Sequence, residues 1–538
     1  MIRRVIGISL ALACFTLLVS AQSAVPSLTA DQWRADIRFL GDELPKHHPN
    51  LFKWMKREDY DAALKALNDR AGTASGNEIL VGMMKIVAMV QDGHTNLIPH
   101  DVFAAKVFPV TFYVFTDGLF IERASPENKD IVGAKVIKVG TLPADEALKQ
   151  LESVTPADNE MGRLEYAPSF MVVPEILAGL KIIPTTASLP LVIEQNGKQR
   201  TVELKPTVTF GESFRSIPQG WVDLASTKAL YQKDPANYFW FEYLKDSKTM
   251  YVQQNAVLNK DGGETIAAFY KRVFDAVDAN PVDKFVLDLR FNNGGNNGFN
   301  RQVIIDIIRS KIDQRGKIFV ITGRRTFSAA QNFVNELEKY TEAIFVGEPT
   351  SGHPNHFGDA TAFVLPNSKF EVPTSSVWWQ DVDPRDRRIW TAPEIAADLS
   401  SEDYRAGRDP AMQAIAEFTP SQGFRESMLA ASDKGADEIK RVFRSFIADP
   451  RHRYVQTEAD MNRFGYVLLR QKKNDEALAV FTLNAEAHPD SANVYDSLGD
   501  VYDALGRKDD AIKAYEKALS IDPNYQSSRE SLRKLKGN

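Results

Sequence analysis

Ser328 is a candidate nucleophile for covalent catalysis because of its place in the sequence. It is the centre of the string TFSAA at residues 326–330, between a predicted strand and a predicted helix. The first turn of a helix offers unpartnered backbone N–H groups and the positive end of the helix dipole, which would stabilise an alkoxide or an oxyanion. Serine is also a favoured helix N-cap, so the local pattern allows a nucleophile or a capping residue.

A glycine-rich loop precedes this region in the chain. Asn293 is followed by Gly294 and Gly295, which carry no side-chain bulk in front of their backbone. Backbone N–H groups presented by such a loop can hold the negative charge of a tetrahedral intermediate. We therefore expect an oxyanion hole formed by the N–H of Gly294 or Gly295 together with that of Ala329.

Two strand–loop–helix units carry these two loops. An apolar run at residues 285–289 leads into the glycine loop and then into a helical pattern at 303–308. A second run at residues 318–321 leads into the serine loop and then into a helix at 328–340. This succession is typical of βα units in a mostly parallel sheet.

Three strings in one order carry a family resemblance. DLRFNNGG at residues 288–295, TFSAA at 326–330 and VGEPTSG at 346–352 closely resemble the C-terminal-processing, or tail-specific, serine peptidase family, which includes the tricorn protease core. The resemblance extends from about residue 28 to 418. It implies a multidomain α/β protein with a Clp protease/crotonase-like catalytic core and with Ser328 as the nucleophile.

The same resemblance assigns a base to the string QDGHT at residues 91–95. In isolation, a histidine after a glycine beyond a helix is a structural residue, but the histidine-using, tricorn-like branch of the family has its base in a similar motif. We therefore expect His94 to be the base. An imidazole with an ordinary pKa near 6.5 can accept the serine proton at neutral pH.

Better-known members of the family use a lysine about 25 residues after the serine, where this chain has His353. Lys339 lies on the helix that Ser328 begins, roughly 16 Å away at the rise of an α-helix. Lys369 lies in a predicted turn. A Ser-His arrangement is therefore preferred to a Ser-Lys dyad, and His353 is expected to line the active-site cleft.

Two groups of residues contain histidines that could be metal ligands. His353, His356 and Asp359 have suitable residue types, but the prolines and glycines around them predict a loop that does not bring them together. His47 and His48 are adjacent and are expected in a surface loop. No metal site and no organic cofactor is expected.

The resemblance implies a carboxylate that orients the histidine, without defining which one. Four candidates lie in one region of the chain: Asp381, Asp383, Asp386 and Glu394. Asp386 is our choice as the third catalytic residue, and the alternative is a surface loop held by salt bridges.

Residues 1–24 are typical of a secretory signal peptide, because Arg3 and Arg4 precede an apolar run that ends in small residues. The single cysteine, Cys14, lies in this run, so the exported chain would contain no thiol. We expect a periplasmic or secreted bacterial protein with no membrane span after signal removal. The net charge of −6 argues against a nucleic-acid partner.

The remaining patterns divide the chain into four parts. We expect an N-terminal helical domain at residues 25–102, a β-rich and possibly PDZ-like insert at 103–207, the catalytic core at 208–420, and a helical linker with repeats at 421–538. The PDZ resemblance depends on the string VGAKVIKVG at residues 132–140.

The last part contains two copies of a 34-residue pattern, at 458–491 and 492–525, with small residues at matching positions. This period is that of the tetratricopeptide repeat, an α-solenoid unit. Two repeats are few for independent stability, so the helices at about residues 424–447 are expected to cap them. The repeats would recruit a protein partner or substrate.

These observations predict an exported serine peptidase that hydrolyses peptide bonds through a Ser-His-carboxylate arrangement. Two alternatives remain open. One is a catalytically weak or inactive peptidase-fold protein that binds partners through its repeats, and the other is an esterase with the same site.

Overall fold

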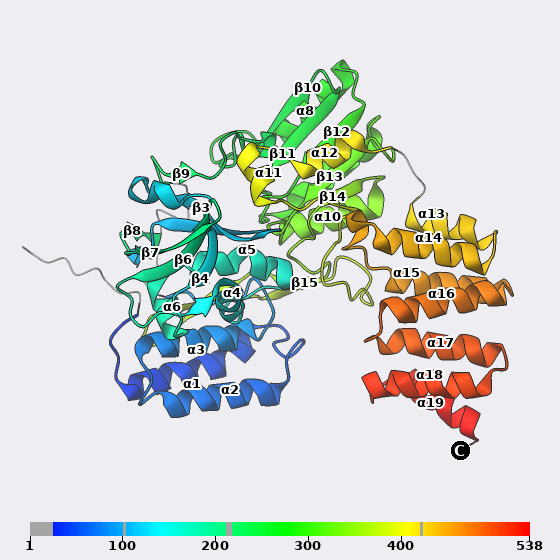
Figure 1. Ribbon diagram of the computed structural model, residues 1–538, viewed down its shortest axis with the longest axis horizontal. Coiled ribbons are helices and arrows are strands. Elements are labelled where there is room, and N and C mark those ends of the chain that lie inside the picture. The colour runs from blue at the N-terminus through cyan, green and yellow to red at the C-terminus, as the bar shows by residue number, and fades with distance from the viewer. Residues whose placement is uncertain (1–24, 100–103, 211–217, 420–422, 538) are drawn as a thin grey trace, which may run out of the picture.

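The computed structural model describes residues 25–99, 104–210, 218–419 and 423–537 (Figure 1). The expected signal peptide, residues 1–24, lies outside these ranges. Within them, no helix combines the length and the apolarity needed to cross a bilayer.

A six-stranded sheet forms the centre of the catalytic part. Its strands, in spatial order, are β10 (Phe239–Leu244), β11 (Thr249–Gln254), β12 (Lys284–Asp288), β13 (Ile318–Thr322), β14 (Ile344–Gly347) and β19 (Ile395–Ala396). All neighbouring pairs are parallel except β10 with β11. The central strands read as continuous apolar runs because both faces of the sheet are buried.

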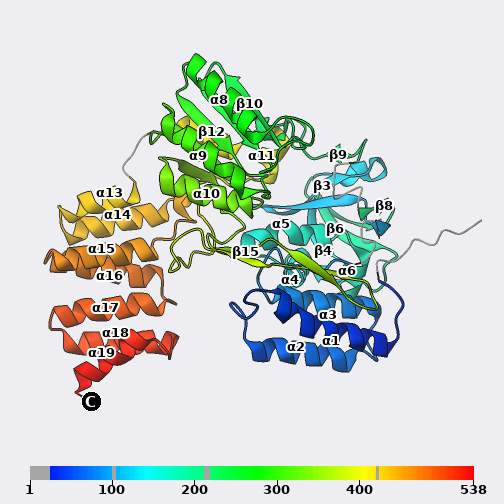
Figure 2. The same ribbon diagram turned by 180° about the vertical axis from the view of Figure 1, so that it is seen from behind.

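Helices cover the two faces of this sheet. One apolar cluster joins it to α8 (Ile266–Ala279), α9 (Asn300–Arg309) and α10 (Ala329–Tyr340), which Figure 2 shows on one side. A second cluster joins the other face to α12 (Pro410–Glu417), which follows α11 (Ser401–Ala406). The two predicted βα units are therefore present, β12 with α9 and β13 with α10.

The N-terminal helices and the β-rich part share one apolar core. The helices are α1 (Ala30–His47), α2 (Arg57–Arg70) and α3 (Gly76–Ala88). They share this core with a seven-stranded sheet built from β2 (Val110–Phe115), β3 (Gly118–Ala124), β4 (Lys135–Val139), β5 (Leu142–Pro143), β6 (Leu189–Gln195), β7 (Lys198–Leu204) and β9 (Val222–Asp223). Helices α4 (Ala144–Glu152), α5 (Glu160–Phe170) and α6 (Pro174–Gly179) belong to the same part. The expected boundary at 102/103 does not separate two cores, and the sheet takes β9 from beyond residue 207.

A long excursion after β14 reaches back from the catalytic part to the N-terminal part. It contains the pairs β15 (His356–Gly358) with β18 (Val377–Trp379), and β16 (Thr361–Val364) with β17 (Glu371–Thr374). Phe370 is buried in the N-terminal core. Asp36 of α1 accepts hydrogen bonds from the backbone N–H groups of Asn367 and Ser368, at 2.9 and 2.7 Å. These contacts join the excursion to the N-terminal part.

The C-terminal part is a stack of helices. It comprises α13 (Phe424–Ser432), α14 (Ala436–Ala448), α15 (Glu458–Arg470), α16 (Asn474–Ala487), α17 (Ala492–Ala504), α18 (Lys508–Ile521) and α19 (Gln526–Lys536). A Cβ added at Gly465 would lie 2.6 Å from Phe481, and one at Gly499 would lie 2.5 Å from Tyr515, so the repeated small residues permit close helix crossings. Helices α13 and α14 share a core with the repeats, as the capping prediction required.

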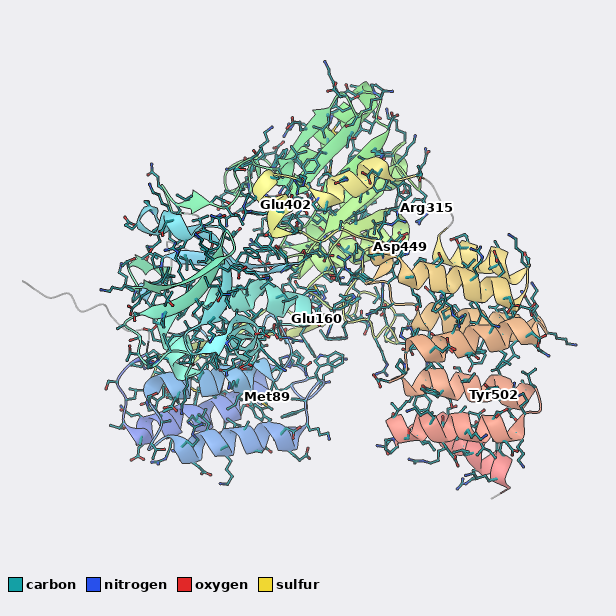
Figure 3. The ribbon with its side chains drawn as sticks, viewed as in Figure 1. Met89, Glu160, Arg315, Glu402, Asp449 and Tyr502 are labelled. Carbon is teal, nitrogen blue, oxygen red and sulfur yellow. The ribbon has the colours of Figure 1, made fainter. Side chains whose placement is uncertain are left out.

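Figure 3 shows how these parts lie in the molecule. Glu160, the first residue of α5, lies near the middle, and Tyr502 marks the repeat helices to one side.

Candidate active site

Ser328 and His94 are brought together from positions 234 residues apart. Ser328 Oγ lies 2.9 Å from His94 Nε2. The serine side chain forms no capping hydrogen bond within the described structure, although α10 begins at the next residue. The interpretation of Ser328 as a simple N-cap is therefore wrong. Its backbone, at φ 54° and ψ −126°, is strained for a residue with a side chain, a conformation that costs about 1–3 kcal/mol and is characteristic of functional sites.

Hydrogen bonds hold the serine loop in this conformation. Thr326 Oγ1 donates to the carbonyl of Leu289 at 2.9 Å and accepts from the N–H of Gly323 at 3.0 Å. The N–H of Phe327 donates to the carbonyl of Asn292 at 3.1 Å. The loop after β13 is thereby tied to the loop after β12, so the serine loop and the glycine loop form one unit.

The loop that carries His94 is positioned by the excursion after β14. The N–H of Asn96 donates to the carbonyl of Pro373 at 2.9 Å, and Ile98 exchanges backbone hydrogen bonds of 2.8 and 2.9 Å with Glu371. The imidazole then stacks on the ring of Phe327, with centroids 4.5 Å apart and planes 27° apart. Packing against the residue before the serine therefore orients the histidine.

Glycine is required at two positions around this pair. A Cβ on Gly93 would lie 2.7 Å from Phe327 Cζ, and a Cβ on Gly294 would lie 2.6 Å from Ser328 Cβ. Gly294 also has a φ of 107°, which disfavours other residues. The absence of both side chains lets the two loops close on Ser328.

The oxyanion donors differ partly from expectation. The N–H of Gly294 already donates to Asn292 Oδ1 at 3.0 Å, so it is not available to a substrate. Gly295 lies in an isolated bridge with Val257, in which the flanking residues make the hydrogen bonds. Among the described residues, the N–H groups of Gly295 and Ala329 have no acceptor. These two donors, rather than Gly294, suit an oxyanion hole.

Asp386 is not brought to His94. Its carboxylate accepts hydrogen bonds from the guanidinium of Arg388, with an ion-pair distance of 2.8 Å. The prediction of Asp386 as the third catalytic residue is therefore wrong, because its carboxylate is paired with Arg388 in a salt-bridged loop. The other three candidates are also engaged elsewhere, Asp381 with Asn335, Asp383 with Arg385 and Glu394 with Arg315.

Asp92 is the carboxylate beside the imidazole. Its Oδ1 lies 3.8 Å from His94 Nδ1, beyond hydrogen-bond length, and accepts the backbone N–H of His94 at 3.0 Å. Its Oδ2 accepts from Thr95 Oγ1 at 2.5 Å and lies 3.2 Å from His48 Nε2. Within the described structure, His94 Nδ1 is buried without a hydrogen-bond partner.

Sequence reasoning missed Asp92 and His48. His48 is buried, which overturns its expected place in a surface loop. In the sequence, only the position of Asp92 two residues before His94 indicates that its carboxylate lies near the imidazole. That spacing allows the carboxylate to bond the histidine's own backbone.

The ionisable groups around the histidine have shifted pKa values. Burial lowers the pKa of His94, against the charges of Asp92 and Asp359 and the backbone of Phe357, which raise it. Burial would raise the pKa of Asp92, but the hydrogen bond from His48 and the charge of His94 outweigh it, so the pKa falls to about 2. His94 is thus a neutral imidazole facing an ionised carboxylate at neutral pH.

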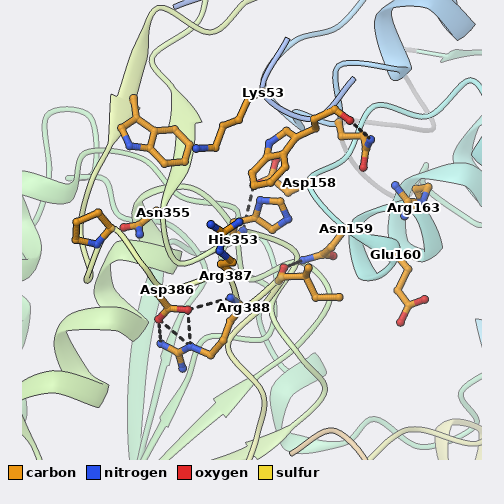
Figure 4. A pocket seen from close by; sticks show the side chains of 15 residues that line it. Lys53, Asp158, Asn159, Glu160, Arg163, His353, Asn355, Asp386, Arg387 and Arg388 are labelled. Carbon is orange, nitrogen blue, oxygen red and sulfur yellow. Dashed lines mark hydrogen bonds and ion pairs between the residues drawn. The ribbon is translucent and has the colours of Figure 1, made fainter. Parts of the chain in front are cut away.

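The lysines considered as bases make other contacts. Lys339 Nζ donates to the carbonyl of Asp381, and Lys369 Nζ to that of Pro366. His353 lines a cavity together with Trp54 and Asp158, and burial lowers its pKa to about 4 (Figure 4). Its place in the active-site cleft stays a prediction.

His353, His356 and Asp359 do not converge on one site. His356 Nδ1 contacts the carbonyl of His353 at 3.1 Å, and Asp359 accepts from Trp379 Nε1 at 3.1 Å. In the described ranges, no three His, Cys, Asp or Glu side chains are arranged to hold a metal ion.

Comparisons with known proteins agree with this fold. A family model described as tetratricopeptide repeat matches residues 456–524. No curated protein sequence matches the chain.

Solved structures match most of the chain at low identity. A CPAF serine-to-alanine mutant matches with a TM-score of 0.53 and 12% identity, covering 74% of this chain and 100% of that one. Mature CPAF complexed with lactacystin matches with a TM-score of 0.51 and 13% identity, covering 72% of this chain and 97% of that one. The photosystem II D1 C-terminal processing protease matches with a TM-score of 0.35 and 12% identity, covering 73% and 98%.

The resemblance predicted from the three sequence strings is confirmed at the level of fold. The chain is similar to CPAF in its multidomain α/β fold, and it continues into a C-terminal tetratricopeptide region.

Proposed function

We propose that this chain is a serine peptidase in which Ser328 is the nucleophile and His94 the general base. The observation that carries the proposal is the 2.9 Å contact between Ser328 Oγ and His94 Nε2 at the start of α10. The proposed reaction begins when Ser328 donates its proton to His94 and its oxygen attacks the peptide carbonyl. The N–H groups of Gly295 and Ala329 then stabilise the oxyanion.

Asp92 supports the imidazolium that this step creates. Its carboxylate carries a negative charge 3.8 Å from His94 Nδ1 and acts without a direct hydrogen bond to the ring. His94 then donates the proton to the leaving amine, and a water molecule hydrolyses the acyl-enzyme by the same route.

Labelling with a serine-reactive phosphonate tests the nucleophile. Ser328→Ala should abolish both labelling and peptide hydrolysis. The matched control is Ser75→Ala, because Ser75 is a true N-cap whose Oγ accepts the N–H of Glu78 at 3.3 Å. That change should lower stability by about 1 kcal/mol and leave labelling intact. Full turnover by the Ser328→Ala variant would exclude this role.

We also propose that the protein is exported and that its repeats bind a protein partner. The sequence pattern of residues 1–24 supports export, and the tetratricopeptide match supports a partner. Mass spectrometry of the protein from the periplasm or culture medium should find a chain that begins after Ala21 or Ala24. An intact N-terminus containing Arg3 would contradict export by signal cleavage.

A further inference from the structure

Hydrogen bonds fix both carboxylate oxygens of Asp92, the residue beside the proposed base. Oδ1 accepts the backbone N–H of His94 at 3.0 Å, and Oδ2 accepts from Thr95 Oγ1 at 2.5 Å and lies 3.2 Å from His48 Nε2. The side chains of His48 and Asp92 are 0% and 1% exposed, so this buried charge depends on protein donors. A carboxylate accepts about four hydrogen bonds, which leaves room on Oδ1 for a further donor.

The protonation of His48 follows from its second ring nitrogen. The backbone N–H of Asn50 donates to His48 Nδ1 at 3.2 Å, so Nδ1 is an acceptor and carries no proton. The ring proton therefore lies on Nε2, which is the atom that faces Asp92. His48 is thus a neutral imidazole that donates to the carboxylate.

The hydroxyl of Thr95 is directed in the same way. The backbone N–H of Ser375 donates to Thr95 Oγ1 at 3.1 Å, so the hydroxyl proton points at Asp92. The residues that direct the two donors come from distant segments, because His48 is the C-cap of α1 and Ser375 follows β17. The orientation of Asp92 therefore depends on the N-terminal helices and on the excursion after β14.

This orientation bears on the protonation of His94. For Nε2 to accept the serine proton, the neutral imidazole must hold its own proton on Nδ1. His94 Nδ1 is buried, has no hydrogen-bond partner among the described residues, and lies 3.8 Å from Asp92 Oδ1. The charge on Oδ1 favours a proton on Nδ1, and a shift of about 1 Å would bring the two atoms to hydrogen-bond distance.

We propose that His48 is a positioning residue of the active site, whose Nε2–H holds Asp92 with Oδ1 facing His94 Nδ1. The proposal rests on the proposed function, in which Ser328 is the nucleophile and His94 the base. His48 acts through Asp92 and so determines which nitrogen of His94 is free to take the serine proton. The end of α1, outside the catalytic core, thereby contributes to the chemistry.

Two substitutions at His48 separate the hydrogen bond from the presence of a polar side chain. In His48→Gln, the amide nitrogen can replace Nε2 and donate to Asp92. In His48→Asn, the amide oxygen can still accept the Asn50 N–H, but the shorter side chain does not reach Asp92. His47→Asn is the matched control, because His47 is the preceding residue and its Nε2 lies 3.6 Å from Glu43 instead.

The first measurement follows His94 directly and needs no substrate. NMR of the histidine-selectively ¹⁵N-labelled protein reports which ring nitrogen is protonated and at what pH the ring titrates, and the His94→Gln variant identifies the signal. The wild type should hold the proton on Nδ1. Because the charge of Asp92 raises the pKa of His94, His48→Asn should lower the titration midpoint by at least ~0.5 pH unit. His48→Gln and His47→Asn should move it by less than about 0.2 pH unit.

The other ionisable groups around this pair are the same in all of these variants. Asp359 and His356 act on His94, and Asp158 acts on Asp92. A change in the His94 midpoint therefore reports the Asp92 carboxylate.

Steady-state kinetics on a short peptide give the second measurement. His48→Asn should lower kcat at least ~5-fold with KM within about 2-fold of the wild type, because the loss is in proton transfer and not in binding. His48→Gln should restore most of the rate, and His47→Asn should stay within about 2-fold of the wild type. If His48→Asn does not fold, His48→Phe replaces it, since a ring at this position keeps the packing on Phe357 and lacks the donor.

Any of three results would overturn the proposal. The first is a wild-type His94 with its proton on Nε2. The second is a midpoint that the variant lacking the donor leaves unchanged, or an unchanged kcat in an active enzyme. The third is an equal loss in His48→Gln and His48→Asn, which would show that His48 only fills space. Because the NMR measurement is independent of turnover, a chain that shows the shift but hydrolyses no peptide would refute the proposed function and leave the role of His48 intact.

Discussion

Packing and charge hold the imidazole of His94, whose Nδ1 atom has no hydrogen-bond partner among the described residues. Phe327 stacks on one face, and the Asp92 carboxylate lies 3.8 Å from Nδ1. Burial and the negative charges therefore act in opposite directions on the pKa of His94, and burial is the larger influence. The residue is a base that is neutral over most of the physiological pH range.

This balance predicts the pH dependence of the reaction. Because the base must be neutral, kcat/KM should rise with pH, with a midpoint below the ordinary histidine pKa of about 6.5. Asp92→Asn removes a charge that raises the pKa of His94, so the midpoint should move to lower pH. The same change should lower kcat at least ~10-fold, because the imidazolium loses its counter-charge.

The matched control is Asp383→Asn, an exposed carboxylate paired with Arg385. It should leave both the midpoint and kcat within about 2-fold of the wild type. A midpoint unmoved by Asp92→Asn, measured from full pH–rate profiles, would show that Asp92 is only structural.

Asp158 should make folding stability depend on pH. Burial and the charge of Asp92 raise the pKa of Asp158 to about 7. Between about pH 4 and pH 7 the folded chain keeps this proton while the unfolded chain, with a pKa near 3.9, has lost it. Stability from this group therefore falls as pH rises through that window, by on the order of 4 kcal/mol. Asp92, with a pKa of about 2, is ionised in both states there and adds nothing.

The apparent unfolding temperature, followed from about pH 4.5 to pH 8, checks this prediction. Asp158→Asn should flatten the profile relative to the wild type. Asp145→Asn, on the exposed first turn of α4, should leave its shape unchanged. A wild-type profile that rises steadily over the window would contradict the assignment.

The sequence predicted individual strands and helices better than the contacts between segments that lie far apart in the chain. The strands and helices around Ser328 have continuous apolar runs and helical periodicity, so both βα units could be read from the chain. The backbone pairing of Ile98 with Glu371 joins segments that share no local pattern. The position of His94 therefore came from family resemblance. Asp386 was misassigned because chain position does not reveal that Arg388 neutralises it.

The contact between two loops yields a prediction for Gly93. Gly93→Ala would place a methyl group about 2.7 Å from the Phe327 ring that orients His94. Because the ring must shift, kcat should fall roughly 10²-fold, as expected for a catalytic group displaced by about 1 Å. Steady-state kinetics and thermal unfolding distinguish this loss from unfolding.

Gly72→Ala is the control for this experiment. A methyl group at Gly72 would meet only the end of the flexible Arg34 side chain, at 3.1 Å. It should change kcat less than about 2-fold. If Gly93→Ala retains full activity, the stacking of His94 on Phe327 does not position the base.

At the scale of the whole molecule, one segment lies between the cavity and the repeat region. Arg387 and Arg388 line the cavity, whereas Trp390 lies 6.3 Å, between ring centroids, from Tyr454, which precedes α15. Tyr454 Oη donates to Asp398 Oδ1 at 2.6 Å, and Arg453 forms an ion pair with the same carboxylate. The C-terminal part is thus fastened to the edge of the catalytic part next to β19.

This attachment predicts that Tyr454 contributes to stability and not to chemistry. Tyr454→Ala removes a hydrogen bond to a charged acceptor and uncovers the buried Trp390, so it should lower the stability of the catalytic part by about 1.5–3 kcal/mol. Tryptophan fluorescence during thermal unfolding should report an earlier transition, while kcat on a short peptide stays within about 3-fold at a temperature where the variant is folded.

Tyr340→Ala is the control, because Tyr340 is 54% exposed at the end of α10. If Tyr454→Ala abolishes hydrolysis of short peptides without lowering the unfolding temperature, the repeat region is part of the catalytic assembly, and the division between a catalytic part and a recruiting part is wrong.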